Sequence, residues 1–160
     1  MPTTASHQPR GSAAARSLKS DPRPEPAQII SARDLLDRAE SRLRESDVVT
    51  DPTEEFSALY QAALRAAGAV LAVTEKPKRR RGSLSAWSRL PQAVPELTGW
   101  ATYFAGLSRL RADAEVGLRP VLEEQIAALR PRVDEFLHVV ETEIIRREQG
   151  KGSKMPAGAA

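Results

Sequence analysis

The sequence predicts an all-α fold, in which four main helices and one short helix form an antiparallel bundle. Apolar residues recur at spacings of three and four through most of the chain, and prolines and acidic residues mark several helix starts. No segment alternates apolar and polar residues as a half-buried strand does. The 160 residues are 41% hydrophobic and 28% charged, which is ordinary for one globular domain.

Both ends of the chain are expected to lie outside this domain. Residues 1–27 are rich in proline, serine, alanine and arginine, and residues 149–160 are rich in glycine, lysine and alanine. Such segments bury too little apolar surface to offset the entropy of ordering, so we expect disordered N- and C-terminal tails. The helical domain is therefore expected over residues 28–148.

The first two helices are predicted from their start signals and apolar spacing. The first is expected at about residues 30–46, with Ser31 and Asp34 as a capping box, and its apolar residues are Ala32, Leu36, Ala39 and Leu43. The second is expected at about residues 52–74, with Asp51 as N-cap. It has a proline at its first position and an apolar stripe of Phe56, Tyr60, Ala63, Ala67 and Val70. Its many alanines allow a partner helix to approach closely.

The middle of the chain predicts a short helix and then a longer one. The segment "SLSAWSRL" has helical spacing and is expected to end at Pro91. Pro95 is expected to open the next helix, which continues to about residue 114 with a stripe of Leu97, Trp100, Phe104 and Leu107. Gly117 stands where a helix C-cap glycine is expected.

The last helix is expected at about residues 120–148, with Pro120 at its start. A single apolar stripe continues across Pro131 and comprises Leu122, Ile126, Leu129, Val133, Phe136, Val140 and Ile144. This continuity predicts one helix that is kinked rather than broken at the proline. Arg146 and Arg147 in the last turn complement the helix dipole.

Composition excludes several classes of chemistry. The chain has no cysteine, which rules out disulfides, zinc–thiolate sites and thiol catalysis. His7 and His138 are too few for a histidine-rich metal centre, and neither a serine-nucleophile motif nor a glycine-rich phosphate loop is present. We therefore expect no metal and no cofactor. No apolar run approaches the ~18 residues that span a bilayer, and no secretory signal is recognisable, so we expect a cytoplasmic protein without a membrane partner.

The stretch "KPKRRRGSLSAW" is the most conspicuous charge feature. It places five cations ahead of a tryptophan: Lys76, Lys78, Arg79, Arg80 and Arg81. Such a run can contact the phosphates of a nucleic acid, or it can be a solvated connector between helices, and composition alone favours the connector. Trp87 and Trp100 can stack on bases. Both fall within helical apolar patterns, however, so core packing is the favoured interpretation.

Three segments carry a family resemblance. "SAWSRL", "PELTGWATYFAG" and "DEFLHVVE", behind an alanine-rich helix and an arginine-rich loop, resemble the actinobacterial SAV-6107-like group of HEPN domains over about residues 30–146. HEPN domains are small helical bundles and are often dimeric. The resemblance implies two kinds of function, because many members are metal-independent endoribonucleases, whereas others are inactive modules that bind RNA, nucleotides or protein partners.

The resemblance also implies a candidate catalytic pair. "RVDEFLH" contains Arg132 and His138 with five residues between them. In a HEPN nuclease His138 would act on the 2′-hydroxyl or the leaving oxygen and Arg132 would stabilise the phosphorane, with the groups meeting across a dimer interface. Val133, however, stands where the family motif prefers a polar residue, and Pro131 precedes the arginine.

These departures lead us to favour a non-catalytic module. Its expected partners are RNA or a nucleotide, a second copy of the chain as a homodimer, or another protein. An endoribonuclease that uses Arg132 and His138 is one alternative, and a bundle that binds only proteins is the other.

Overall fold

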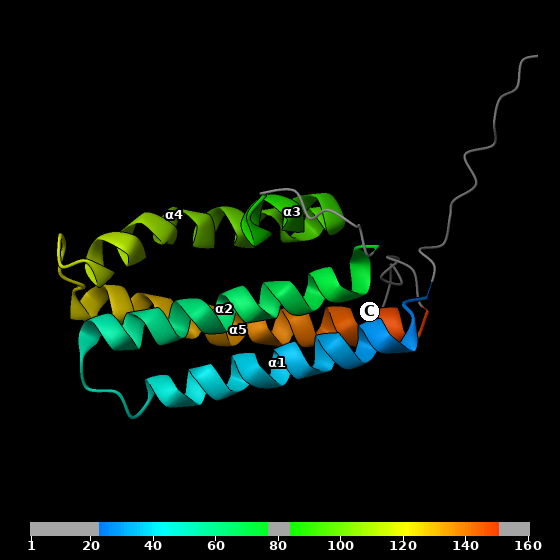
Figure 1. Cartoon of the computed structure of the whole chain (residues 1–160), viewed down its shortest axis with the longest axis horizontal. Helices are drawn as coiled ribbons and strands as arrows, with labels where there is room; N and C mark the ends of the chain where they lie inside the picture. Colours follow the sequence, from blue (N-terminus) through cyan, green and yellow to red (C-terminus); the bar gives the residue numbers. More distant parts are fainter. Residues whose placement is uncertain (1–22, 77–83, 151–160) are drawn as a thin grey trace, which may run out of the picture.

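In the part of the chain that the structure describes, the protein forms an all-α bundle with four long helices and one short helix. Figure 1 shows the computed structural model, which describes residues 23–76 and 84–150 and contains no strand within them. The elements are α1 (Pro26–Ser46), α2 (Pro52–Thr74), α3 (Ala86–Ala93), the 3₁₀ turn η1 (Pro95–Leu97), α4 (Thr98–Glu115) and α5 (Glu123–Glu148). The predicted fold class is confirmed. Most of the two predicted tails lies outside the described residues, although residues 26 and 27 already belong to α1.

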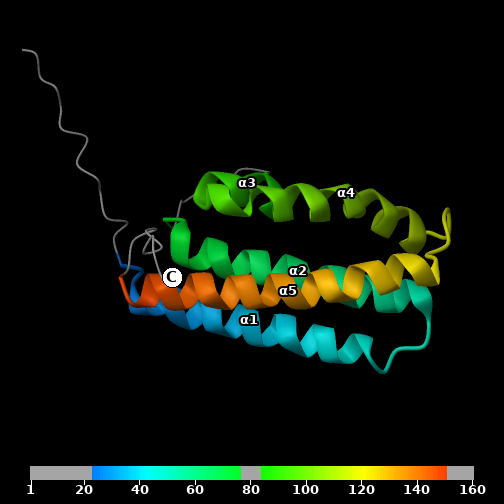
Figure 2. The same cartoon turned by 180° about the vertical axis from the view of Figure 1, so that it is seen from behind.

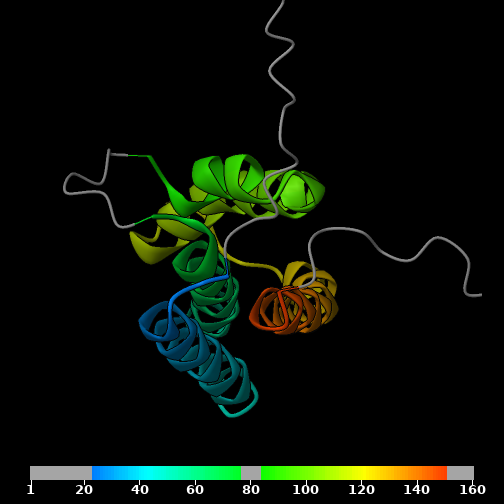
Figure 3. The ribbon, with the colours of Figure 1, turned by 90° about the vertical axis from the view of Figure 1, so that its right-hand side faces the viewer.

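The long helices that follow one another along the chain run antiparallel. α1, α2 and α5 lie alongside one another, and α3 and α4 lie on the side of α2 and α5 that faces away from α1 (Figures 1 and 3). The start of α1 and the end of α5 meet at one end of the bundle (Figure 2). There the Arg33 guanidinium pairs with both carboxylate oxygens of Glu148 at 2.9 Å, which ties the first helix to the last.

The start of α1 differs from the prediction. The helix begins at Pro26, and the Gln28 side-chain oxygen accepts a hydrogen bond at 2.8 Å from the backbone N–H just before that proline. The predicted capping box of Ser31 and Asp34 is wrong, because both residues lie inside the helix. Asp34 pairs instead with Arg38, one turn further along. A glutamine at the third helical position provides the cap here.

The start of α5 is corrected in the same way. The helix begins at Glu123 and not at Pro120, which belongs to the preceding connection. The Gln125 side-chain oxygen accepts from the Leu122 N–H at 2.9 Å, so a glutamine again occupies the third position. α5 then continues as one helix through Pro131, whose side chain is exposed, as the apolar stripe predicts. The place of Leu122 in that stripe is wrong, because this residue precedes the helix and is exposed.

Two predictions about the prolines around α3 are partly wrong. Pro91 does not end this helix, which continues to Ala93. The Ser85 side chain caps its start by accepting from the Ser88 N–H at 3.2 Å. Pro95 opens a 3₁₀ turn, and α4 follows directly from it.

Two other helix ends follow the sequence signals. α2 has its predicted bounds, and the Asp51 carboxylate accepts from the Glu54 N–H at 3.0 Å. α4 ends at Glu115, and Gly117, the residue after the C-cap, has a φ of 74° in the left-handed region, as the predicted C-cap glycine requires. The N–H of Leu118 then donates to the Asp113 carbonyl oxygen at 2.8 Å, which completes a Schellman motif.

α2 is the central and most apolar helix. Its length and hydropathy would suffice to span a bilayer, which corrects the expectation that no such run exists, but 67% of the apolar window is buried inside the bundle. The window also contains buried alanines, which let α1 approach closely: Ala62, Ala63, Ala66, Ala67 and Ala69. These are the features of a core helix in a bundle.

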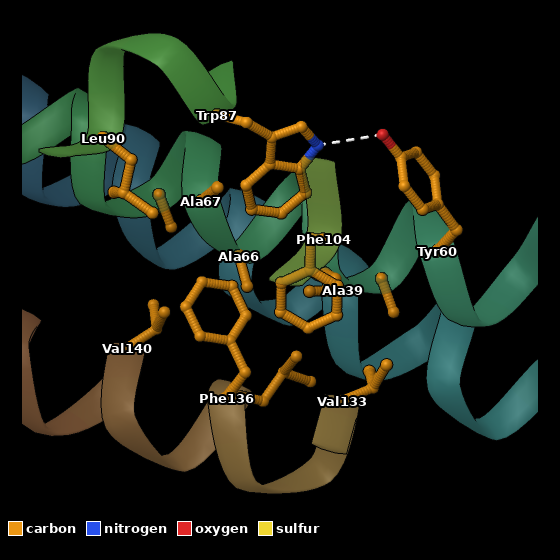
Figure 4. Close-up of a cluster of buried hydrophobic side chains, with 14 of the residues drawn as sticks. Ala39, Tyr60, Ala66, Ala67, Trp87, Leu90, Phe104, Val133, Phe136 and Val140 are labelled. Carbon is orange, nitrogen blue, oxygen red and sulfur yellow. Dashed lines mark hydrogen bonds between the residues drawn. The ribbon is translucent and has the colours of Figure 1, made fainter. Parts of the chain in front are cut away.

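Aromatic rings fill the space between α2, α3, α4 and α5 (Figure 4). Trp87 is only 6% exposed and stacks on Phe104, with ring centroids 5.0 Å apart. Phe104 in turn contacts Phe136 of α5, also at 5.0 Å. Since Phe104 and Phe136 are fully buried, these rings fix how α4 sits on α5.

Candidate functional site

Arg132 and His138 project from α5 in different directions. They are six residues apart, which on an α-helix places them about 9 Å apart along the axis and about 120° apart around it. Both side chains are exposed. The two side chains therefore leave the helix in different directions.

His138 lies on the outward face of α5. Its Nδ1 is 3.1 Å from the carbonyl oxygen of Asp134, a geometry in which Nδ1 carries a proton and Nε2 is the unprotonated nitrogen of the neutral ring. Within residues 23–76 and 84–150, no side chain hydrogen-bonds to the imidazole. A catalytic histidine is normally held in one orientation by such a group, so this ring has the surroundings of a surface histidine.

Arg132 lies on the side of α5 that faces α4. Its guanidinium carbon is 5.7 Å from the centroid of the Tyr103 ring, a cation–π contact between the two helices. The other arginines of α5 each bond to a carboxylate of the chain: Arg130, Arg146 and Arg147. Arg132 has no ion pair with the described residues, and its guanidinium contacts the aromatic ring of Tyr103 instead.

Tyr103 is half-buried between α4 and α5. Burial raises the pKa of its hydroxyl above 10.0 because the phenolate would lose hydration, and the positive charge of Arg132 offsets part of the rise. Its ring meets Phe104 edge-on, with centroids 5.1 Å apart. The ring under Arg132 is thus anchored to the aromatic core.

Residue 133, directly after Arg132, packs in the core of the bundle. Val133 is fully buried and belongs to the core face of α5, whereas Pro131 on the other side of the arginine is exposed. A polar side chain at residue 133, as the HEPN catalytic motif prefers, would point into the core of this bundle.

The basic run is placed only in part. Lys76, just after α2, is exposed. The other four cations lie outside the described residues: Lys78, Arg79, Arg80 and Arg81. Nothing in the described structure therefore joins this run to Arg132 or His138.

Core packing is confirmed for Trp87, whereas Trp100 lies at the edge of the core. Trp87 is buried, and its indole N–H donates to the Tyr60 hydroxyl at 2.8 Å. Trp100 is half-buried and packs against Phe104 and Phe136, with centroids 6.1 and 5.3 Å away. Core packing therefore accounts fully for Trp87 and in part for Trp100.

Sequence analysis did not single out Tyr103. It lies three residues after Trp100, so both are on the same face of α4, and both are half-buried beside the core. Leu107 on α4 and Val139 on α5 are also partly buried there. The spacing from Trp100 was the available signal, but nothing in the sequence paired Tyr103 with an arginine of another helix.

Neither the groove between α1 and α2 nor a metal cluster of the described residues involves Arg132 or His138. A shallow groove of about 260 Å³ lies between α1 and α2, and neither residue lines it. In the part of the chain that the structure describes, no three histidine, aspartate or glutamate side chains gather as metal ligands would. The candidate site is therefore a surface formed by side chains of α4 and α5.

A comparison with protein families supports the resemblance found in the sequence. The family model of SAV-6107-like HEPN domains matches residues 46–141, which is more than half of the chain and includes Arg132 and His138. The match extends from the last residue of α1 into the last third of α5. No curated protein and no solved structure matches the chain.

Proposed function

The chain belongs to the SAV-6107-like HEPN family, and from this premise we propose that it is a non-catalytic helical module that binds single-stranded RNA. The observation that carries the proposal is the different setting of the two motif residues. Arg132 is an exposed cation without an ion pair to the described residues, whereas His138 lies about 120° away around α5 without an orienting side chain.

The chemistry of Arg132 suits a phosphate ligand. A guanidinium presents planar N–H groups that match phosphate oxygens, and it keeps its charge at every physiological pH. The Tyr103 ring beside it is half-buried, and partly exposed aromatic rings are typical of surfaces that accept unstacked bases. In the sequence, Lys76 begins a run of cations, and we propose that this run adds phosphate contacts that do not read base identity.

The same geometry argues against cleavage by a single protomer. Metal-independent hydrolysis of RNA needs a proton-transfer group and a charge-stabilising group at the same phosphate. Here Arg132 lies over Tyr103, and His138 leaves α5 about 120° away around the helix. Phosphate binding, by contrast, does not require His138.

A dimeric endoribonuclease is the second candidate function. Arg132 and His138 are both exposed on one helix, so a second copy of the chain packed on α5 could supply the missing group. In that arrangement His138 of one protomer and Arg132 of the other would share a phosphate. We propose the homodimer only as part of this alternative.

One experiment separates the two functions. End-labelled single-stranded RNA is incubated in EDTA with the wild type and with His138→Ala and Arg132→Ala, and the products are resolved on a denaturing gel. The proposed module leaves the RNA at full length with all three proteins while the wild type binds it. Fragments that form with the wild type and disappear with both variants would establish the nuclease instead.

A further inference from the structure

The contact between Arg132 and Tyr103 is the one place in the described structure where an α5 arginine packs on a ring of another helix. The guanidinium carbon lies 5.7 Å from the ring centroid. Glu135, three residues further along α5, is at a spacing that permits an ion pair, yet no ion pair between them forms. The Tyr103 ring therefore contacts the Arg132 guanidinium, and no carboxylate of the described residues neutralises its charge.

The ring itself is held firmly. Tyr103 packs edge-on against Phe104, which is fully buried and contacts Phe136 of α5. A ring anchored in this way limits the rotamers of a long side chain lying on it. An arginine in a cation–π contact also keeps N–H groups available for hydrogen bonds to an anion.

We propose that Tyr103 is a positioning residue, which holds the Arg132 guanidinium in place for one phosphate of the bound RNA. This inference rests on the proposed function and names the part of the surface that carries it. The ring acts by shape and by its π-face, so the hydroxyl of Tyr103 is dispensable. Holding the guanidinium before RNA arrives lowers the entropy lost when the phosphate binds.

A second copy of the chain is the competing occupant of this surface. Trp100, Tyr103, Leu107 and Val139 are only partly buried, so α4 and α5 offer a strip of apolar surface that a dimer would cover. An arginine without an ion pair favours a phosphate over an apolar partner, because covering an unneutralised charge is costly. The two occupants predict different measurements.

The test is an equilibrium titration of a fluorescent single-stranded RNA oligonucleotide, followed by anisotropy in EDTA. Arg132→Ala is expected to weaken binding about ten-fold, because a charge-assisted contact to phosphate is lost. Tyr103→Leu is expected to weaken it about two- to five-fold, the range of an exposed cation–π contact, whereas Tyr103→Phe keeps wild-type affinity. Arg109→Ala, which removes an exposed arginine of α4, is the control for net charge and is expected to change affinity less than two-fold.

The double variant Tyr103→Leu with Arg132→Ala distinguishes a positioning role of Tyr103 from a merely structural one. If Tyr103 acts through Arg132, Tyr103→Leu weakens binding in the wild type but has no further effect in Arg132→Ala. The inference is overturned if the two effects add, if Tyr103→Phe binds as weakly as Tyr103→Leu, or if the variants dissociate a dimer and leave RNA affinity unchanged. Absence of RNA binding by the wild type would overturn the proposed function itself, and so is distinguishable from these results. Thermal unfolding of each variant verifies that it is folded.

Discussion

The indole N–H of Trp87 donates a hydrogen bond to the hydroxyl oxygen of Tyr60 at 2.8 Å, inside the aromatic core. This bond joins the short helix α3 to the central helix α2 across 27 residues of sequence, which include the basic run. It satisfies the one polar atom of a tryptophan that is otherwise packed on rings. The helix that follows the basic run therefore has a fixed position on the bundle.

Removal of the Tyr60 hydroxyl should destabilise the fold. Tyr60→Phe leaves the Trp87 N–H buried without an acceptor, which costs about 1–3 kcal/mol of unfolding free energy. Urea denaturation measures this cost. In a Trp87→Phe background no donor is left unsatisfied, so the same Tyr60→Phe change should cost about 1 kcal/mol less. Equal costs in the two backgrounds would show that the hydrogen bond contributes nothing.

Arg130 is predicted to hold α5 against the α1–α2 connection. Its guanidinium donates to the side-chain and carbonyl oxygens of Ser46 at 2.9 and 3.2 Å and pairs with Asp47 and Glu55 at 2.5 and 2.6 Å. Arg130→Ala should lower the unfolding free energy by about 1–3 kcal/mol, because several charge-assisted bonds are lost together. Arg38→Ala, which breaks one exposed pair on α1, is the control and should cost under about 0.5 kcal/mol. Similar costs for both would contradict the role given to Arg130.

Replacing glycines by alanine should have opposite effects on the unfolding free energy inside α4 and after its end. Gly117→Ala forces a side chain into the left-handed region and should destabilise the protein by about 1 kcal/mol. Gly99 and Gly106 lie inside the helix, where an added Cβ meets no atom within 4 Å. Alanine at either position should therefore raise the unfolding free energy by about 0.5–1 kcal/mol. Thermal or urea denaturation of the three single variants distinguishes the signs.

The fold followed from local signals where those signals were strong. Asp51 and the apolar stripe fixed α2 to its observed bounds, and the continuous stripe across Pro131 predicted one helix for α5. The starts of α1 and α5 were misplaced because the caps come from Gln28 and Gln125, which accept hydrogen bonds from the backbone three residues earlier. A glutamine is also a common residue inside helices, so it marks a start less clearly than serine or aspartate does.

The site was harder to predict than the fold. Helical spacing alone shows that Arg132 and His138 diverge, since both are on one helix. The contact of Arg132 with Tyr103 joins residues of two helices, and only the packing of α4 on α5 brings them together. The sequence carried no signal for that pairing.

The titration of Tyr103 tests the contact without RNA. Burial raises the pKa of Tyr103 above 10.0 and Arg132 lowers it, so Arg132→Ala should raise it further. The chain has two tyrosines, so in a Tyr60→Phe background the phenolate absorbance reports Tyr103 alone. A titration midpoint that stays unchanged or falls in Arg132→Ala would show that the charge does not act on the ring.

The same pKa shift predicts how stability depends on pH. A hydroxyl whose pKa is raised by folding contributes its full stabilisation below its unfolded pKa of about 10, and loses it as pH rises through the folded pKa. Above pH 10 the wild type should therefore lose unfolding free energy relative to Tyr103→Phe, which has no such group. Urea denaturation of both proteins at several alkaline pH values measures the difference. If the difference in unfolding free energy between the two proteins does not change with pH, the raised pKa of Tyr103 is contradicted.

Binding without cleavage is tested most directly by titrating labelled single-stranded RNA with the wild-type protein and then recovering that RNA for size analysis. We predict saturable binding in EDTA that weakens as salt rises from about 50 to about 200 mM, and RNA that returns at full length. Failure to bind at the lower salt concentration, or shortened RNA that is not produced by His138→Ala, would contradict the account.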